Sequence, residues 1–161
     1  MKNKIKYFVM DVDGTLTDGK IYMGMRGEQF KVFNIKDGYA INKMLPLNGI
    51  TPVIITGRNS KITENRCMEL GIKELHQEVA NKEEVLRRLL QRDCAEFSQV
   101  AYIGDDLNDL SCMEIIKRNG GITGCPADAV PEVKNICDFI SLHKGGEGAV
   151  RDFIEYLTDR K

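Results

Sequence analysis

Short apolar runs alternate with segments of helical spacing along this chain, and that alternation limits the fold more than any other feature. Buried strands are predicted at 5–10, 51–56 and 100–103, with shorter strands around Leu75 and at 122–124 and 139–140. Helices are predicted between them, at 37–47, 59–70, 81–92, 106–118 and 149–157. The alternation predicts an α/β fold: a Rossmann-like, mostly parallel sheet with helices on both faces.

One segment interrupts this alternation. Residues 18–33 carry three glycines between two short runs with strand composition, which predicts a β-hairpin inserted after the first strand. The gaps between strands are otherwise filled by single helices, so no cap domain is expected. The length of 161 residues predicts a single domain, residues 1–161, with 18–33 as a hairpin flap.

Composition excludes several classes of function. The formal net charge is −1, and no basic stripe indicates nucleic-acid binding. No apolar run is long enough to span a membrane, and the first residues lack the pattern of a signal peptide. The five cysteines are scattered and form no CxxC pair, so we expect reduced thiols and a cytoplasmic protein.

Polar residues follow each main strand, where ligands bind in open α/β sheets. Asp11 and Asp13 follow the first strand, Thr56-Gly57 the second and Asp105 the third, while Lys82 opens a helix. Three carboxylates in one crevice repel one another unless a cation lies between them, and hard oxygen ligands suit Mg²⁺. Lys82 and the backbone amides near Thr56-Gly57, at a predicted helix N-terminus, suit a phosphoryl group. The set predicts phosphoryl transfer.

Each motif alone also has a purely structural interpretation. Asp13-Gly14 could form an ordinary turn, and Asp106 could cap a helix. Lys82 alone could be a solvated helix residue. Their joint occurrence, in this order and after successive strands, favours a catalytic site.

The segments DVDGTLTDG, ITGR, NK and GDDLND resemble, in order, the four motifs of the haloacid dehalogenase-like hydrolase superfamily. The resemblance covers the whole chain. It is closer to the capless sugar-acid phosphatases, the group that acts on 3-deoxy-D-manno-octulosonate 8-phosphate (KDO 8-phosphate). There the matching segments are TLTDG, FNIKDG, TGR, GDDLNDL and GGEGAVRDF, together with Arg66.

The resemblance implies specific roles. Asp11 would attack phosphorus to form an aspartyl-phosphate, and Asp13 would protonate the leaving oxygen and then activate water. The metal ligands would be Asp11, Asp105 and the backbone carbonyl of Asp13. The phosphoryl oxygens would be held by Thr56, Gly57 and Lys82. Behind them, Asp109 would orient Lys82, and Asn108 is placed in the same supporting shell.

Substrate contacts are also implied by the resemblance. They are Asn34, Lys36, Asp37, Gly38, Arg58 and Arg66. Arg58 and Arg66 are eight residues apart on one predicted helix, and arginine binds carboxylates in a bidentate manner. KDO 8-phosphate is therefore the expected substrate. A nine-carbon sugar acid 9-phosphate, such as KDN or N-acylneuraminate 9-phosphate, stays open because Asn59-Ser60 departs from the pattern after TGR.

Without a cap, a single chain would leave the site open to water. The resemblance implies a homotetramer in which neighbours cover the site, and the apolar hairpin fits that role. The glycines at 145–148 would either approach a ligand or form a plain loop. Two other functions stay open: a receiver-type signalling domain and a non-catalytic oligomerisation module.

Overall fold

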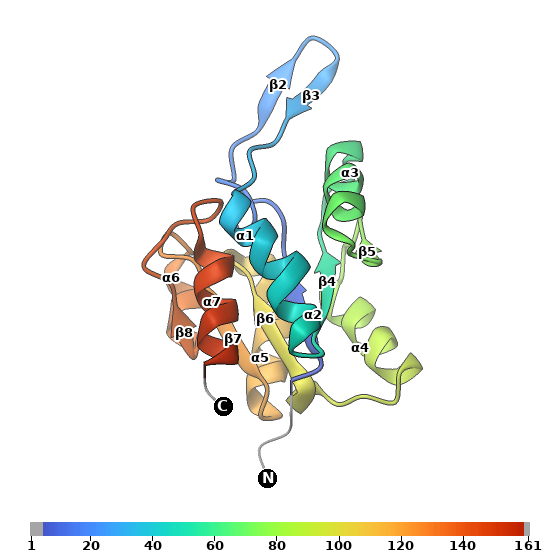
Figure 1. Ribbon diagram of the computed structural model, residues 1–161, viewed down its shortest axis with the longest axis vertical. Coiled ribbons are helices and arrows are strands. Elements are labelled where there is room, and N and C mark those ends of the chain that lie inside the picture. Colours follow the sequence, from blue (N-terminus) through green and yellow to red (C-terminus); the bar gives the residue numbers. More distant parts are fainter. Residues whose placement is uncertain (1–4, 160–161) are drawn as a thin grey trace.

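The computed structural model describes residues 5–159, and a single parallel sheet forms its centre (Figure 1). Its order is β5-β4-β1-β6-β7-β8, and every pairing is parallel. The strands are β1 (Tyr7–Met10), β4 (Thr51–Ile55), β5 (Glu74–His76), β6 (Val100–Ile103), β7 (Ile122–Cys125) and β8 (Phe139–Ile140). The expected Rossmann-like sheet is confirmed.

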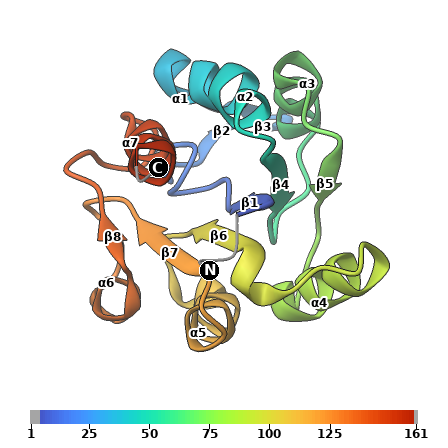
Figure 2. The same ribbon diagram turned by 60° about the horizontal axis from the view of Figure 1, so that its bottom comes forward.

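Helices cover both faces of the sheet, as Figure 2 shows. One face carries α1 (Ile35–Tyr39), α2 (Leu45–Leu47), α3 (Lys61–Leu70) and α7 (Ala149–Thr158). The other carries α4 (Lys82–Arg92), α5 (Leu110–Arg118) and α6 (Pro131–Ile136). Alternate strand residues serve the two faces: Phe8 and Met10 join the first apolar cluster, and Val9 between them joins the second.

The helical segment at 35–47 is irregular in its middle. A π-helical turn, Ala40–Met44, lies between α1 and α2. Its end is marked by Leu45, whose N–H donates to the Ala40 carbonyl five residues earlier. Pro46 follows directly and has no N–H to donate, which disfavours a regular α-helical ladder at this point.

Most predicted boundaries lie within two residues of the observed ones. Helix α3 ends at Gly71, whose left-handed φ of 74° terminates it. The Asn81 side chain accepts a hydrogen bond from the Glu84 N–H and so caps α4. The segment at 106–118 begins with a 3₁₀ turn, Leu107–Asp109, before α5, and another, Phe97–Gln99, precedes β6.

The predicted hairpin is present and projects from the carboxyl ends of the strands (Figure 1). It consists of β2 (Tyr22–Gly24) and β3 (Gly27–Phe30), paired antiparallel. The rings of Tyr22 and Phe30 stack with centroids 4.5 Å apart. Within residues 5–159 no separate cap domain is inserted, and no helix there has the length and apolarity needed to cross a bilayer.

Candidate active site

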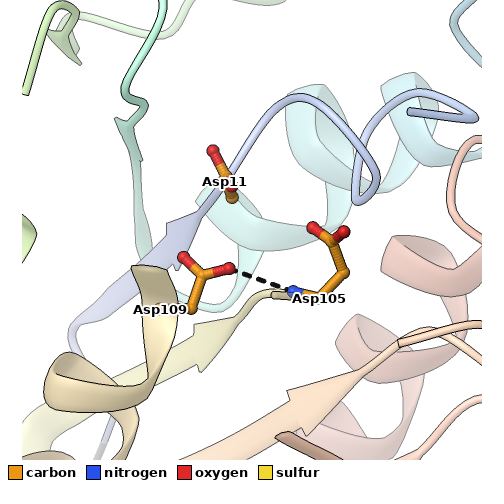
Figure 3. Close-up of side chains that lie close together, drawn as sticks. All are labelled: Asp11, Asp105 and Asp109. Carbon is orange, nitrogen blue, oxygen red and sulfur yellow. Dashed lines mark hydrogen bonds between the residues drawn. The ribbon is translucent and has the colours of Figure 1, made fainter. Parts of the chain in front are cut away.

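Three aspartates meet at the carboxyl ends of the central strands. Asp11 directly follows β1, and Asp105 and Asp109 follow β6. Figure 3 shows their side chains arranged around a common point, and one carboxylate oxygen of each lies within 4.8 Å of the others. Asp11 and Asp109 are almost completely buried, whereas Asp105 is half-buried. The sheet therefore brings Asp11 and Asp105 together as expected, but the third carboxylate of the cluster is Asp109 and not Asp13, which the sequence had suggested.

Lys82, the first residue of α4, is buried between two of these carboxylates. Its Nζ lies 2.8 Å from Asp11 Oδ2 and 2.8 Å from Asp109 Oδ1. Burial alone would lower the pKa of Lys82, but the negative charges of Asp109 and Asp11 outweigh it and raise that pKa. Lys82 therefore carries a positive charge and is not a solvated helix residue.

The acidic cluster carries more negative charge than Lys82 can balance. Burial first, and the charge of Asp109 second, raise the pKa of Asp11 to about 6, although Lys82 acts in the opposite direction. Burial, with the charges of Asp109 and Asp11, raises the pKa of Asp105 to about 7. A divalent cation would relieve this repulsion, and carboxylate oxygens are ligands that Mg²⁺ prefers. The cluster therefore fits a metal ion.

Asp109 differs from the other two carboxylates because its oxygens are already engaged. Its Oδ1 accepts from the Tyr102 hydroxyl at 2.7 Å and from Lys82, and its Oδ2 accepts the N–H groups of Asp105 and Asp106 at 3.0 and 3.3 Å. Asp109 is thus an organiser of the site, which leaves Asp11 and Asp105 as better metal ligands. Sequence reasoning missed Tyr102, which had appeared only as a strand residue.

Gly14 is required where the first loop passes the cluster. A Cβ at this position would lie 2.0 Å from Asp105 Oδ2, and its φ is +91°. The neighbouring Thr15 hydroxyl donates to Asp105 Oδ1 at 2.9 Å. Residues 11–15, which we call the DxDGT loop, therefore position Asp105 as well as contributing two aspartates of their own.

Thr56 and Gly57 follow β4 as predicted, but they do not lie at a helix N-terminus. Helix α3 begins only at Lys61, and the Thr56 N–H donates to the His76 carbonyl at 2.9 Å. The expectation that the backbone amides near Thr56-Gly57 lie at a helix N-terminus is therefore wrong, and the Thr56 amide is already hydrogen-bonded. The groups left at this position are the Thr56 hydroxyl and the Gly57 N–H.

Asp13 contacts the hairpin, which the sequence did not indicate. Its Oδ1 accepts a hydrogen bond from Lys31 Nζ, immediately after β3. Lys31 Nζ also lies 2.9 Å from Glu28 Oε1. Burial raises the pKa of Glu28, but hydrogen bonds from Lys31 and Ser60 outweigh it and lower that pKa overall. These residues link the hairpin base to a predicted catalytic group.

The two arginines expected on one helix have separate neighbours. Arg58 precedes α3, and its Nη2 lies 3.4 Å from Glu28 Oε1. Its Nη1 is buried and has no hydrogen-bond partner in the part of the chain that the structure describes. Arg66, inside α3, stacks over the Phe33 ring at 5.4 Å and donates to the Asn34 carbonyl. Placing both arginines on one helix is therefore wrong, because α3 begins after Arg58.

The segment FNIKDG, residues 33–38, has some side chains at the surface and others in the interior. Asn34 caps α1, and Lys36 is exposed. Asp37 is buried, its Oδ1 accepts the Arg151 N–H at 2.8 Å, and burial raises its pKa to about 6. Gly38 packs so closely on Arg66 that a Cβ would lie 2.4 Å from Nη2. Four of the predicted substrate contacts line one pocket: Asn34, Asp37, Gly38 and Arg66.

The remaining predicted residues lie around the rim of the site. Asn108 is exposed on the 3₁₀ turn before α5. Gly145 and Gly146 pack against the DxDGT loop of the same chain: the Gly146 N–H donates to the Thr15 carbonyl at 3.1 Å. A Cβ at Gly145 would lie 1.9 Å from the Gly14 carbonyl oxygen. These glycines therefore permit close backbone contact with the loop that carries Asp11 and Asp13.

The chain matches known proteins over nearly its whole length. A family model described as haloacid dehalogenase-like hydrolase matches residues 69–154. The chain is 42% identical over 153 residues to 3-deoxy-D-manno-octulosonate 8-phosphate phosphatase KdsC from Salmonella typhi. The aligned region covers 95% of this chain and 79% of that protein. KdsC from Escherichia coli K12 matches with the same identity and coverage.

Solved structures give the same result. The Moraxella catarrhalis KDO 8-phosphate phosphatase, in complex with magnesium, phosphate and KDO, superposes with a TM-score of 0.90 at 36% identity, covering 98% of this chain and 87% of that chain. The cobalt-bound Haemophilus influenzae phosphatase superposes with a TM-score of 0.89 at 35% identity, covering 97% and 88%.

The chain belongs to the haloacid dehalogenase-like hydrolase family. Within it, the relatives at 42% identity are phosphatases, so the predicted enzyme class, a phosphoric monoester hydrolase, is confirmed. The predicted cofactor, Mg²⁺, is confirmed by the family, by the magnesium-bound relative and by the cluster of Asp11, Asp105 and Asp109.

Proposed function

We propose that this protein hydrolyses KDO 8-phosphate to KDO and phosphate through an aspartyl-phosphate on Asp11. The observation that supports this mechanism most is the position of Lys82, whose Nζ lies 2.8 Å from Asp11 Oδ2 and 2.8 Å from Asp109 Oδ1. A buried cation beside a strand-end carboxylate is the arrangement that phosphoryl transfer needs. The relatives named KDO 8-phosphate phosphatase support the substrate.

The proposed reaction has two displacements. In the first, a carboxylate oxygen of Asp11 attacks phosphorus, the bond from phosphorus to the sugar oxygen breaks, and Asp13 gives its proton to that oxygen. In the second, Asp13 takes a proton from water, the water oxygen attacks phosphorus, and the bond to Asp11 breaks. Phosphate leaves, and both aspartates return to their starting states.

The other residues hold the phosphoryl group. Lys82, the Thr56 hydroxyl and the Gly57 N–H bind its oxygens, and Asp109 orients Lys82. Asp11, Asp105 and the Asp13 carbonyl would hold Mg²⁺, which when bound neutralises the carboxylates and the charge on the phosphoryl oxygens. Because Asp13 would bind the metal only through its backbone, the metal would not occupy its carboxyl, which can then transfer a proton.

Asp11→Asn tests the mechanism. The variant should release no phosphate from KDO 8-phosphate in the presence of Mg²⁺, because an amide is a poor nucleophile. Its circular dichroism should match the wild type, since Asn fills the same space. Phosphate release by the folded variant would refute Asp11 as the nucleophile. Asp159→Asn, at the exposed end of α7, is the matched control and should retain activity.

The same assay separates the candidate substrates. A nine-carbon sugar acid 9-phosphate is the alternative, and it would be supported by a higher kcat/KM than that for KDO 8-phosphate. Membership of a hydrolase family disfavours the receiver domain and the non-catalytic module. A stable phosphoprotein without turnover would support the receiver domain, and no metal-dependent hydrolysis of any phosphate ester would support the module.

We also propose that residues 1–161 form one phosphatase domain, with 18–33 as its flap, and that four copies complete one another's sites. Apolar side chains are exposed along and below the flap: Met23, Met25, Phe30 and Ile35 are 64, 106, 52 and 78% exposed. Sedimentation equilibrium should give a tetrameric mass, and a monomeric mass would contradict the shared site. All five cysteines are free, which supports a cytoplasmic location.

A further inference from the structure

Lys31 is a buried cation at the base of the hairpin. It directly follows β3, and its side chain is only 1% exposed. Its Nζ forms ion pairs with Asp13 Oδ1 and with Glu28 Oε1. A buried ammonium group is stable only when it is paired and hydrogen-bonded. The position of the hairpin base therefore depends on the Asp13 carboxyl group, and the reverse also holds.

Glu28 fixes the other side of Lys31. Its Oε2 accepts a hydrogen bond from the Ser60 hydroxyl at 3.0 Å, just before α3. Its Oε1 lies 3.4 Å from Arg58 Nη2 as well as 2.9 Å from Lys31 Nζ. Glu28 thus ties β3 to the segment between β4 and α3. We call Glu28 and Lys31 the hairpin clamp.

We propose that the hairpin clamp positions the Asp13 carboxyl for proton transfer, with Lys31 as the positioning residue. This inference rests on the proposed function, in which Asp13 acts as acid and base. A carboxyl that is not held by the metal can rotate about its side-chain bonds. The hydrogen bond from Lys31 fixes Oδ1 and so leaves Oδ2 to meet the leaving oxygen. Each hairpin thereby acts on the active site of its own chain.

If the hairpin clamp has this role, the loss of activity on replacing Lys31 should depend on the leaving group of the substrate. A sugar alkoxide is a poor leaving group and needs the proton from Asp13, whereas p-nitrophenolate leaves without one. A well-placed general acid contributes about 10²- to 10⁴-fold to rate. Removing the group that orients the acid should therefore lower kcat/KM, which reports the first displacement, for the sugar phosphate and spare it for p-nitrophenyl phosphate. The second displacement, in which Asp13 acts as base, is common to both esters.

The experiment compares Lys31→Met and Lys31→Arg with the wild-type protein in saturating Mg²⁺. Lys31→Met should lower kcat/KM for KDO 8-phosphate about tenfold or more, and lower kcat/KM for p-nitrophenyl phosphate less than about threefold. Lys31→Arg keeps the charge and should recover part of the loss. Lys20→Met is the control, because Lys20 lies in the same insertion, is exposed, and pairs only weakly with Asp18.

Equal losses of kcat/KM on both esters, or no loss on either, would overturn the clamp while leaving the proposed function intact. Hydrolysis of neither ester by the wild-type protein would overturn the proposed function, and the clamp with it. If Lys31→Met fails to fold, Glu28→Gln replaces it. That variant keeps the contact between Lys31 and Asp13 but loses one ionic anchor, and it should show a smaller loss with the same dependence on leaving group.

Discussion

Tyr102→Phe removes one hydroxyl group from beneath the active site. Tyr102 is completely buried in β6, and its hydroxyl donates to Asp109 Oδ1 at 2.7 Å. Burial, followed by the charge of Asp109, raises the pKa of Tyr102 well above its usual value, so the hydroxyl keeps its proton at any working pH. Phenylalanine keeps the ring and deletes only this donor.

The loss of stability expected in Tyr102→Phe follows from the negative charge on Asp109. A hydrogen bond to a charged group contributes about 1.5–3 kcal/mol to stability. For a domain of this size, each kcal/mol shifts Tm by roughly 2–4 °C, so Tm should fall by about 3–12 °C. Among residues 5–159, the lost donor also leaves Lys82 as the only side chain bonded to Oδ1. Lys82 should then move toward Asp109 and away from Asp11, and kcat should fall about tenfold.

Thermal unfolding and steady-state kinetics with Mg²⁺ measure both effects. Tyr7→Phe is the matched control. Tyr7 begins β1, at the end of that strand away from Asp11, and its hydroxyl donates to Asp93 near the surface. The control should change stability by no more than about 0.5 kcal/mol and leave kcat unchanged. Equal stability losses in the two variants would refute the reasoning about the buried charge. A large stability loss with an unchanged kcat would refute the coupling to Lys82.

Three further predictions concern other parts of the chain. In Gly145→Ala, the new Cβ would lie 1.9 Å from the Gly14 carbonyl oxygen and would force the two loops apart by about 1.5 Å, so kcat should fall about 10²-fold. Gly120→Ala is the control. Its Cβ would lie in open space but at a φ of +83°, so this variant should reduce Tm and leave kcat unchanged. Mg²⁺ at 100 times its Kd should stabilise the protein by about 2.7 kcal/mol in thermal unfolding, and Asp105→Asn should remove that gain. Asp152 accepts a hydrogen bond from the His143 ring at 2.8 Å and raises the pKa of His143. The pKa of His143 is therefore higher in the folded state than in the unfolded state. This pair stabilises the fold fully below the unfolded-state pKa, and its contribution is lost as the pH rises through the folded-state pKa. Nuclear magnetic resonance titration should show His143 titrating at lower pH in Asp152→Asn.

The sheet could be predicted because its strands are buried on both sides. Such strands are apolar at successive positions, as in the run at 100–103, and the chain separates them with helical segments. Local signals also placed Gly71 at the end of α3. The start of α3 could not be found locally. Ser60 stays extended because its N–H donates to Gln77 Oε1 at 2.8 Å and its hydroxyl bonds Glu28, both distant in sequence.

The central site could be predicted for a related reason. Parallel strands deliver whatever follows them to the same edge, so Asp11 and Asp105 had to meet. Lys82 was expected there because it opens a predicted helix in the same series of polar residues, although nothing local distinguishes it from a solvated lysine. Tyr102 carried no signal at all, because a tyrosine in an apolar strand is ordinary until its hydroxyl is seen beside Asp109.

The hairpin shows why contacts between distant elements escape sequence reasoning. Its composition predicted two strands and an apolar surface, and both are present. The contacts at its base join residues that are distant in the sequence: Lys31 bonds Asp13, and Glu28 bonds Ser60. The apolar surface and the charged base therefore support different proposals. Exposed methionines near the tip suit contact with another copy, whereas the hairpin clamp ties each flap to the acid of its own chain, so assembly and proton transfer should respond to different substitutions.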